Sequence, residues 1–194
     1  MYDTTSDEDI SLNPLILKSI CENTLPPQLE RTSLTQVNVT HIADNGDIYV
    51  QLKNSNIFYI EKLIHNLVES KFNINNEFQL NIDMIKSIVK SEQLFFIYDV
   101  KDNKWYRAQL IEIISDNDIK MFYIDYGKTR LVDMKNIYSL DKISAALNQF
   151  PAQSLKVRLY GIQIINDNVI GRLKGILDGD GEGIVSKLFY YVFL

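Results

Sequence analysis

The sequence is short of the residues that build metal sites and nucleophilic active sites. It has one cysteine, Cys21, and two histidines, His41 and His65, which are far apart along the 194 residues. One cysteine excludes an intrachain disulfide framework, and so few thiol and imidazole groups argue against a zinc site. A glycine-rich phosphate loop and a nucleophile elbow are absent too. We therefore expect no cofactor, no metal ion and no enzymatic activity.

Basic charge and long apolar runs are also scarce. Lys and Arg number 20 against 25 Asp and Glu, which gives a formal net charge of −5. A nucleic-acid surface needs clustered cations to displace counterions, so we expect no direct nucleic-acid partner, whereas a cationic peptide suits this charge. The longest apolar run, 188–194, is too short to span a bilayer. Because the acidic start lacks the pattern of a secretory signal, we expect no membrane association.

Near its end the sequence contains a partial calcium-binding motif. Residues 178–183 match the start of a calcium-binding loop, with carboxylates at the first, third and fifth positions and a glycine at the sixth. The twelfth position, where a bidentate Glu belongs, is Phe189. The pattern is therefore more typical of a hairpin loop rich in Gly and Asp than of a calcium site.

Hydrophobic periodicity divides the chain into four parts. Residues 1–34 read as an acidic, weakly ordered lead-in, with a short helix beginning near Asn13. Residues 35–91 predict a hairpin around an Asn-Gly turn, then a helix with one apolar face, then a second helix in the latter half of 78–89. Residues 92–140 alternate short strands with tight polar turns, which is typical of a small barrel. Residues 141–194 predict a strand, a helix and a final strand. The fold class expected is α+β, mostly β with helices.

Two stretches stand out from this pattern: WYRAQL at 105–110 and FYIDYG at 122–127. Tyr123 and Tyr126 are three residues apart in a predicted strand. Because strand side chains alternate between faces, two tyrosines at this spacing should point in opposite directions. The glycine that follows them raises the question of whether the strand continues that far.

The two stretches carry a resemblance. Residues 104–132 resemble the core of a Tudor domain, and specifically the extended Tudor type of germline granule proteins. The segment FPAQ at 150–153, followed by LKVRLYGI, is similar to the strand that follows this core in the family. The extended type is a small Tudor barrel inserted into a staphylococcal-nuclease-like OB fold. The resemblance thus implies a barrel at 92–140 and an OB half split between 35–91 and 141–194.

The resemblance also implies an aromatic cage. Its walls fall on Tyr106, Tyr123 and Tyr126, and the strand would bend at 125–127 so that both later tyrosines reach one site. Gly127 would supply the backbone freedom for the bend, and Asp125 would pair with Arg107. Rings around a cation attract it through their quadrupoles, at roughly 0.5–2 kcal/mol per contact. A methylated guanidinium keeps its charge but is less hydrated, so it suits such a box.

Two positions depart from the family pattern. Another aromatic usually precedes WYRA, but that position falls here on Asp99 or Val100. Tyr98 could provide a fourth wall only if the turn carries a further residue. An Asn often follows the glycine, whereas this chain has Lys128, a cation that would repel an arginine unless its long stem swings to solvent. Asp99 could instead pair with the ligand's charge, which would favour arginine in general over its methylated form.

Two functional hypotheses follow. In the first, the chain is a non-catalytic module that binds an arginine, unmethylated or symmetrically dimethylated, in an arginine-rich tail of a PIWI-type Argonaute protein. By resemblance it would be a scaffold in piRNA-pathway assembly, in cytoplasmic, perinuclear germline granules. In the second, it is a structural or self-associating interaction domain whose cage is degenerate. A nuclease is disfavoured, because no convincing cluster of acids and arginines for metal-assisted cleavage is present.

Overall fold

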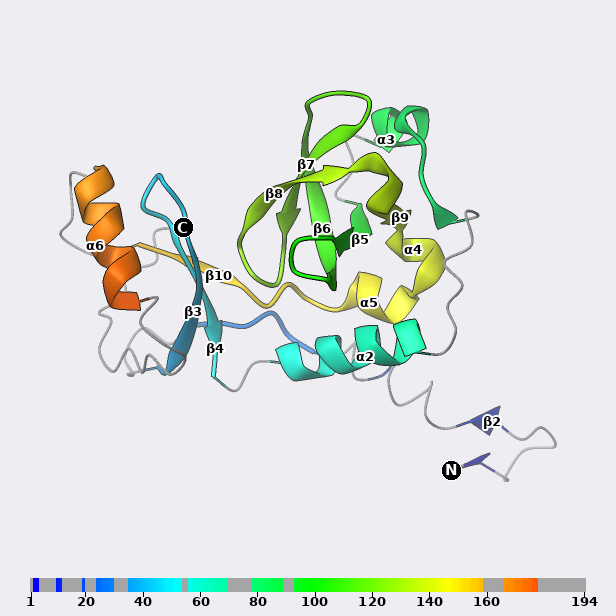
Figure 1. Ribbon diagram of the computed structural model, residues 1–194. Helices are drawn as coiled ribbons and strands as arrows, with labels where there is room; N and C mark the ends of the chain where they lie inside the picture. The colour runs from blue at the N-terminus through cyan, green and yellow to red at the C-terminus, as the bar shows by residue number, and fades with distance from the viewer. Residues whose placement is uncertain are drawn as a thin grey trace.

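The computed structural model describes residues 2–3, 10–11, 19, 24–29, 35–53, 56–69, 78–88, 93–158 and 166–177. These residues form two main antiparallel sheets, with helices beside them (Figure 1). Short strands β1 (Tyr2–Asp3) and β2 (Ile10–Ser11) pair within the lead-in, where the sequence predicts no strands. The observed class is α+β, as the periodicity predicts.

The larger sheet is the barrel, in the order β8-β7-β6-β5-β9. Its strands are β5 (Leu94–Asp99), β6 (Lys104–Ile113), β7 (Asp118–Tyr123), β8 (Thr129–Asp133) and β9 (Ile137–Ser139). Alternate residues of β6 and β7 point into one apolar core, which includes Ala108, Ile119 and Met121. Short polar turns join β5 to β6 and β6 to β7, so this region of the chain pairs mostly with its own neighbours.

The smaller sheet, in the order β10-β4-β3, joins segments from far apart in the sequence. Strands β3 (Val37–Ile42) and β4 (Ile48–Leu52) form the predicted hairpin, and Gly46 in its turn has a φ of +81°. Strand β10 (Leu155–Val157) pairs with β4. Helix α6 (Asp167–Leu177) lies beside this sheet (Figure 1). The regions before and after the barrel thus form one structure.

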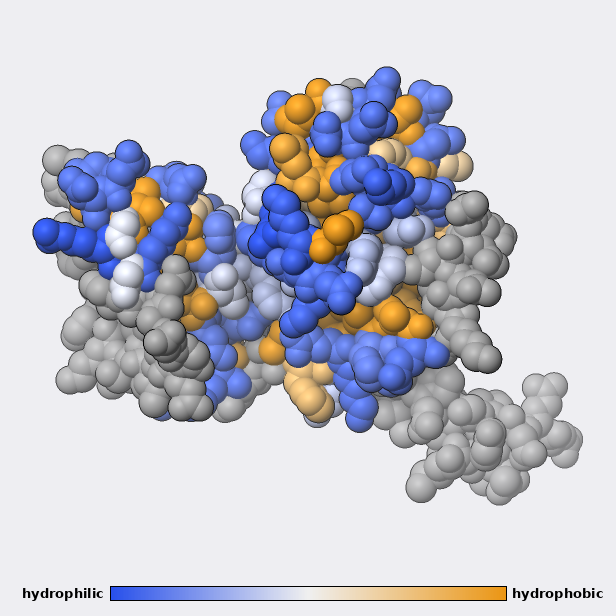
Figure 2. Space-filling view, viewed as in Figure 1, coloured by the Kyte–Doolittle hydropathy of each residue, from blue (hydrophilic) through white to orange (hydrophobic). Residues whose placement is uncertain are grey.

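Helix α2 (Ile57–Glu69) lies across one side of the barrel. It buries Ile60 against Phe96 and Phe150, and Figure 2 shows hydrophobic residues between the helix and the barrel. The other helices are short: α3 (Ile82–Ile88), η2 (Met134–Asn136), α4 (Leu140–Ile143) and α5 (Ala145–Gln149). Helix α3 confirms the prediction for the latter half of 78–89. Helices α4 and α5 were not predicted, because five residues or fewer show no helical period.

A buried ion pair ties these parts together. Arg107 Nη2 lies 2.6 Å from Asp125 Oδ1 and its Nε 2.9 Å from Oδ2, as the sequence predicts. Arg107 also donates to the carbonyl of Leu147, after the barrel, at 2.6 Å. The side chain of Gln51 in β4 donates to the Asp125 carbonyl, and the backbone N–H of Gln153 donates to the Asp125 carboxylate. The pair therefore joins β6, the β7–β8 bend and both flanking segments.

Several predictions lie outside the described residues: the helix near Asn13, the partial calcium motif and the final strand at 186–194. The boundaries at 34, 91 and 140 remain predictions. Of the helices in the described part of the chain, none has both the length and the apolar character needed to cross a membrane.

Candidate functional site

The strand that carries both tyrosines ends in a bend. Strand β7 stops at Tyr123, and the amides of Tyr126 and Gly127 both donate to the Tyr123 carbonyl, at 3.1 and 2.8 Å. The Tyr123 amide donates in turn to the Lys128 carbonyl at 2.9 Å. Gly127 has a φ of +72°, a conformation that favours glycine. The bend breaks the alternation of faces, so the three-residue spacing no longer separates the two tyrosine rings.

Space as well as conformation requires a glycine here. A Cβ added to Gly127 would lie 2.0 Å from Cγ of Tyr49 in β4. Thr40 of β3 holds the same bend from the side, because its hydroxyl donates to the Tyr126 carbonyl at 2.8 Å. The smaller sheet thus packs directly against the bend that positions Tyr126 and Lys128.

The bend gathers the three tyrosines predicted as cage walls. The ring centroids of Tyr106 and Tyr123 are 4.8 Å apart and nearly stacked, at 29°. Those of Tyr106 and Tyr126 are 5.2 Å apart and nearly perpendicular, at 87°. Tyr123 is fully buried, whereas Tyr126 is half-buried. The rings form two walls at right angles with Tyr106 at the corner.

A cation already lies among these rings, and it belongs to the chain itself. Nζ of Lys128 is 4.3 Å from the centroid of Tyr106, 4.9 Å from that of Tyr123 and 5.9 Å from that of Tyr126. Distances within about 6 Å are those of cation–π attraction. The Lys128 side chain has not swung to solvent; only 16% of it is exposed. The site can therefore hold a cation, and it holds an ammonium group.

Two carboxylates balance the charge. Asp102 accepts hydrogen bonds from the Lys128 ammonium and, at 2.9 Å, from the Tyr106 hydroxyl. Asp99 accepts from the Tyr123 hydroxyl at 2.8 Å. Arg130 of β8 contacts both carboxylates, at 3.6 Å from Asp99 and 3.2 Å from Asp102. Two acids thus face two bases, and the local charge sums to zero.

The pKa values reflect this environment. The hydrogen bond from Lys128 is the main cause that lowers the pKa of the Asp102 carboxyl below its usual value. Burial raises the pKa of the Tyr106 and Tyr123 hydroxyls well above 10.0, and the bonds to the two carboxylates raise them further. Burial and the bond to Glu61 do the same for Tyr126. The tyrosines therefore stay neutral near pH 7 and present intact rings to a cation.

The structure separates the three residues considered for the fourth position. Asp99 reaches the tyrosine cluster through Tyr123, as a charge partner would. Tyr98 lies with its ring 5.2 Å from Trp105, and its hydroxyl donates to Asn103. Val100 lies in the turn with 65% of its surface exposed. The contacts of Tyr98 place it with Trp105, on the other side of the strand from Tyr106.

Sequence reasoning missed Asp102 and Arg130. Asp102 falls in the KDNK turn, where an acidic residue is ordinary and gives no signal of its own. In the structure the Asp99 carboxylate accepts from the Lys101 and Asp102 amides, which shapes the turn and directs Asp102 towards Tyr106. An Asp that is followed two or three residues later by a turn often accepts hydrogen bonds from the backbone amides of that turn. Asp99 before the KDNK turn could therefore have indicated this turn conformation.

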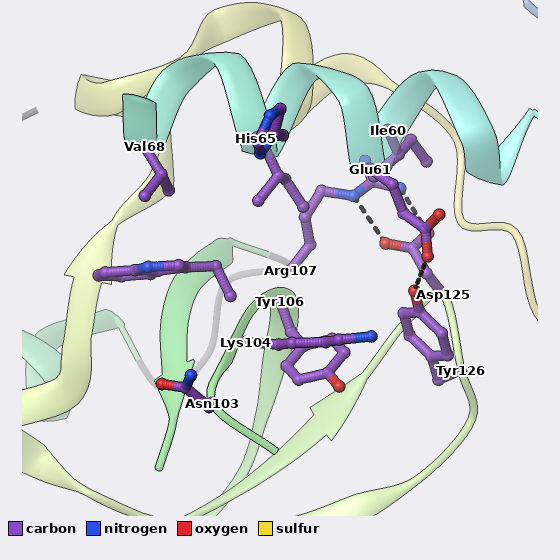
Figure 3. Close-up of a pocket in the computed structure, with 12 residues that line it drawn as sticks. Ile60, Glu61, His65, Val68, Asn103, Lys104, Tyr106, Arg107, Asp125 and Tyr126 are labelled. Atoms are coloured by element: carbon purple, nitrogen blue, oxygen red, sulfur yellow. Dashed lines mark hydrogen bonds and ion pairs between the residues drawn. The ribbon is translucent and has the colours of Figure 1, made fainter. Parts of the chain in front are cut away.

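A cavity of about 360 Å³ adjoins the three clustered rings, between helix α2 and strand β6 (Figure 3). Tyr106 and Tyr126 line this cavity and also belong to the ring cluster. On the α2 side, the Glu61 carboxylate accepts from the Tyr126 hydroxyl at 2.7 Å. A chain segment lying in this cavity could extend a side chain towards the tyrosines. Among the described residues, no group of three or more His, Cys, Asp and Glu side chains is placed to hold a metal ion.

Comparison with known proteins gives one family. The model of the Tudor domain matches residues 29–161. Tudor domain-containing protein 7 of Canis lupus familiaris is 22% identical over 161 residues, which cover 80% of this chain. RING finger protein 17 of Homo sapiens is 28% identical over 141 residues, or 71% of this chain. The chain spans only 14% and 8% of the length of these two relatives.

Solved structures give the same fold. The extended Tudor domain TD3 of mouse TDRD1, in complex with a MILI peptide containing dimethylarginine, superposes with a TM-score of 0.60 at 15% identity, covering 79% of this chain and 76% of that one. A mutant extended Tudor domain of Papi from Drosophila melanogaster, in complex with a methylated Piwi N-terminal peptide, gives 0.60 at 17% identity, covering 74% and 70%. The same domain has been solved with the unmethylated peptide. Identities this low establish the fold alone.

Proposed function

Because the chain belongs to the Tudor domain family, a family of non-catalytic binding modules, we propose that it binds an arginine side chain of a partner protein between Tyr106, Tyr123 and Tyr126. One observation carries the proposal: the three rings already surround a cation, with Nζ of Lys128 within 6 Å of each centroid. An arginine in this place would meet the same rings and the Asp102 carboxylate.

The adjoining cavity supports a peptide as the ligand. A segment lying between α2 and β6 would pass Tyr106 and Tyr126, from which its arginine could enter the ring cluster. The Glu61 carboxylate at this edge, together with the chain's net charge of −5, favours a basic segment. The ligand proposed is therefore an arginine-rich, extended segment.

The partner proposed is the arginine-rich tail of a PIWI-type Argonaute protein. Two solved domains of the same fold are in complex with MILI and Piwi peptides, which supports this class of partner. In this proposal the domain is a scaffold for piRNA-pathway assembly in cytoplasmic, perinuclear germline granules. The resemblance of residues 104–132 to the extended Tudor type of germline granule proteins supports this location.

We further propose that methylation of the arginine matters little. Asp102 and Asp99 offer carboxylate oxygens, which bind guanidinium N–H groups, and methylation removes such donors. The contacts of Tyr98 are with Trp105 and Asn103, so its ring is not counted as a fourth apolar wall. The expected preference for the symmetrically dimethylated form is below tenfold, or about 1.4 kcal/mol.

Calorimetry with one arginine peptide, unmodified and symmetrically dimethylated, tests the proposal. Tyr126→Ala should weaken binding of both forms by about 1 kcal/mol or more, because it removes one cation–π wall. Tyr126 is half-buried, so circular dichroism should show a folded variant. The matched control is Tyr59→Ala, an exposed tyrosine at the start of α2. Unchanged affinity in folded Tyr126→Ala would refute arginine binding at this site.

A second candidate function has an observation in its favour. Lys128 fills the ring cluster, as it would in an interaction domain whose cage never takes a ligand. Such a domain would bind a partner through other surfaces or associate with itself. Sedimentation of the free chain and the peptide titration distinguish the two: an oligomer that binds neither peptide supports the second.

A further inference from the structure

Lys128 lies where a cationic ligand would have to bind. Its ammonium is closest to the Tyr106 ring, at 4.3 Å from the centroid, and it also contacts the Tyr106 hydroxyl at 3.3 Å. It also donates a hydrogen bond to the Asp102 carboxylate and lies within 6 Å of the Tyr123 and Tyr126 ring centroids. The lysine thus uses the face of the rings and the anion that an arginine would use. Both cannot have the same contacts at once.

We propose that Lys128 is a built-in competitor that closes the cage in the free protein, and that a ligand cation binds only by exchanging with it. This inference rests on the proposed function and deepens it, because it names what regulates access to the site. The competitor follows Gly127 in the same bend, so its backbone lies at a fixed place beside the rings.

Charge makes the binding an exchange. With Lys128 in place, Asp99 and Asp102 are balanced by Lys128 and Arg130. The site is partly shielded from water: Asp99 is 5% exposed and the Lys128 side chain 16%, whereas the side chains of Asp102 and Arg130 are 24% and 32% exposed. A further cation would leave an unbalanced positive charge in this shielded place, where like charges repel strongly. A ligand arginine therefore enters as the lysine leaves.

Arginine has an advantage in this exchange. An ammonium is compact and strongly hydrated, so Lys128 gains hydration when its flexible stem moves into water. A guanidinium is more weakly hydrated, stacks on aromatic faces and can bind a carboxylate through two parallel bonds. The same comparison implies that a lysine peptide would displace Lys128 poorly. The exchange thus selects arginine over lysine.

The expected size follows from the fraction of open sites. An affinity measured on a protein whose competent state is partly populated is reduced by that fraction. If about one cage in ten is open, removing the lysine raises the measured affinity about tenfold. The neutral variant Lys128→Gln keeps a polar side chain of similar length, so it removes the cation and leaves the tyrosines in place.

The experiment compares three proteins: the wild type, Lys128→Gln and the control Lys120→Gln. Lys120 of β7 has a side chain that is 42% exposed and lies 3.9 Å from Glu112, so its substitution makes the same charge change elsewhere on the barrel. Each is titrated with the symmetrically dimethylated and unmodified arginine peptides and with a peptide in which lysine replaces the arginine. NMR of the free wild type adds a measurement without ligand: the ε-methylene protons of Lys128, assigned by their loss in Lys128→Gln, should be shifted upfield by the rings.

The inference predicts upfield-shifted Lys128 protons that return to ordinary values as the arginine peptide binds, and about tenfold tighter binding to Lys128→Gln than to the wild type or Lys120→Gln. Wild type and Lys128→Gln with equal affinity would overturn the competitor while leaving arginine binding intact. Lys128 protons at ordinary values in the free protein would also overturn it. Shifted protons with no binding by Lys128→Gln would instead refute the proposed function, and the exchange with it.

Discussion

Strand β6 carries an aromatic cluster on each of its two faces, and the two differ in whether a cation lies among the clustered rings. Tyr106 belongs to the ring cluster with Tyr123 and Tyr126, which surrounds an ammonium and adjoins two carboxylates. Its neighbour Trp105 stacks on Phe96, at 4.6 Å and 14°, and lies near Tyr98 and Tyr138. Among the described residues, no cation lies over the rings of Trp105, Phe96, Tyr98 or Tyr138, although Arg107 on this side lies 6.0 Å from the centroid of Phe150. Aromatic residues alone therefore do not single out the candidate site; the ammonium among the rings does.

On the Trp105 side of β6, the buried Arg107–Asp125 pair stabilises the fold. Removing one of these charges should have the largest effect of the changes that compare the two faces. Asp125→Asn would leave Arg107 buried with no charged partner, at an expected cost of roughly 3–5 kcal/mol in the free energy of unfolding. Urea denaturation measures this cost. Asp116→Asn is the control, since Asp116 pairs with Lys86 on the surface and is 77% exposed. If both variants lose the same small amount, the ion pair does not join the two sheets.

Hydroxyl groups offer a smaller and more closely matched comparison. Tyr123→Phe removes the donor to Asp99 in a buried place, whereas Tyr98→Phe removes the donor to Asn103 in an exposed one. The first should cost about 1–3 kcal/mol because it leaves a buried carboxylate short of one bond. The second should stay within about 0.5 kcal/mol. Equal losses by urea denaturation would mean that the two clusters are alike in their polar contacts.

Alkaline titration gives the smallest expected effect. The pKa values of Tyr106 and Tyr123 are raised by burial first and by carboxylates second, whereas that of Tyr138 near Trp105 is raised by burial alone. A raised folded pKa adds stability that is complete below the ordinary value of 10.0. That stability declines as the pH rises further, because the unfolded chain then releases a proton that the folded chain keeps.

Tyrosinate absorbance measures this effect. Tyr106→Phe should remove a tyrosine that ionises later than the one removed by Tyr138→Phe. The denatured protein, in which tyrosines ionise near their ordinary value, provides the reference. Identical ionisation curves for the two folded variants would show that the carboxylates near Tyr106 do not act on its hydroxyl.

Much of the fold could be predicted because it depends on local periodicity. The Asn-Gly turn fixes the hairpin of β3 and β4, and the apolar face of 57–69 makes α2 a helix. Short elements such as α4 and α5 could not be predicted, because they form only by packing Leu140 and Leu147 on the barrel. The pairing of β10 with β4 came from the resemblance, since no local signal joins residues a hundred positions apart.

The site was predictable in its rings but not in its occupant. The grouping of the three tyrosines follows from the family resemblance that WYRAQL and FYIDYG carry, and the pairing of Arg107 with Asp125 was expected from the same two motifs. From the sequence, the Lys128 side chain could lie either in solvent or among the rings. In the structure it lies among the rings, where it binds Asp102. That contact joins residues 26 positions apart, and no strand pattern encodes it.

The close packing of Gly127 against Tyr49 affects how fast the proposed exchange of Lys128 for a ligand arginine can occur. The backbone at the bend is held by the smaller sheet and by the bond from the Tyr123 amide to the Lys128 carbonyl, so the main chain has no hinge there. Lys128 can leave only by turning about its own side-chain bonds. Rotamer changes of this kind take picoseconds to nanoseconds on exposed side chains, whereas loop and domain movements take up to milliseconds. We therefore expect peptide association in a single kinetic phase without a lag. Because only the open fraction can bind, Lys128→Gln should differ from the wild type in the association rate.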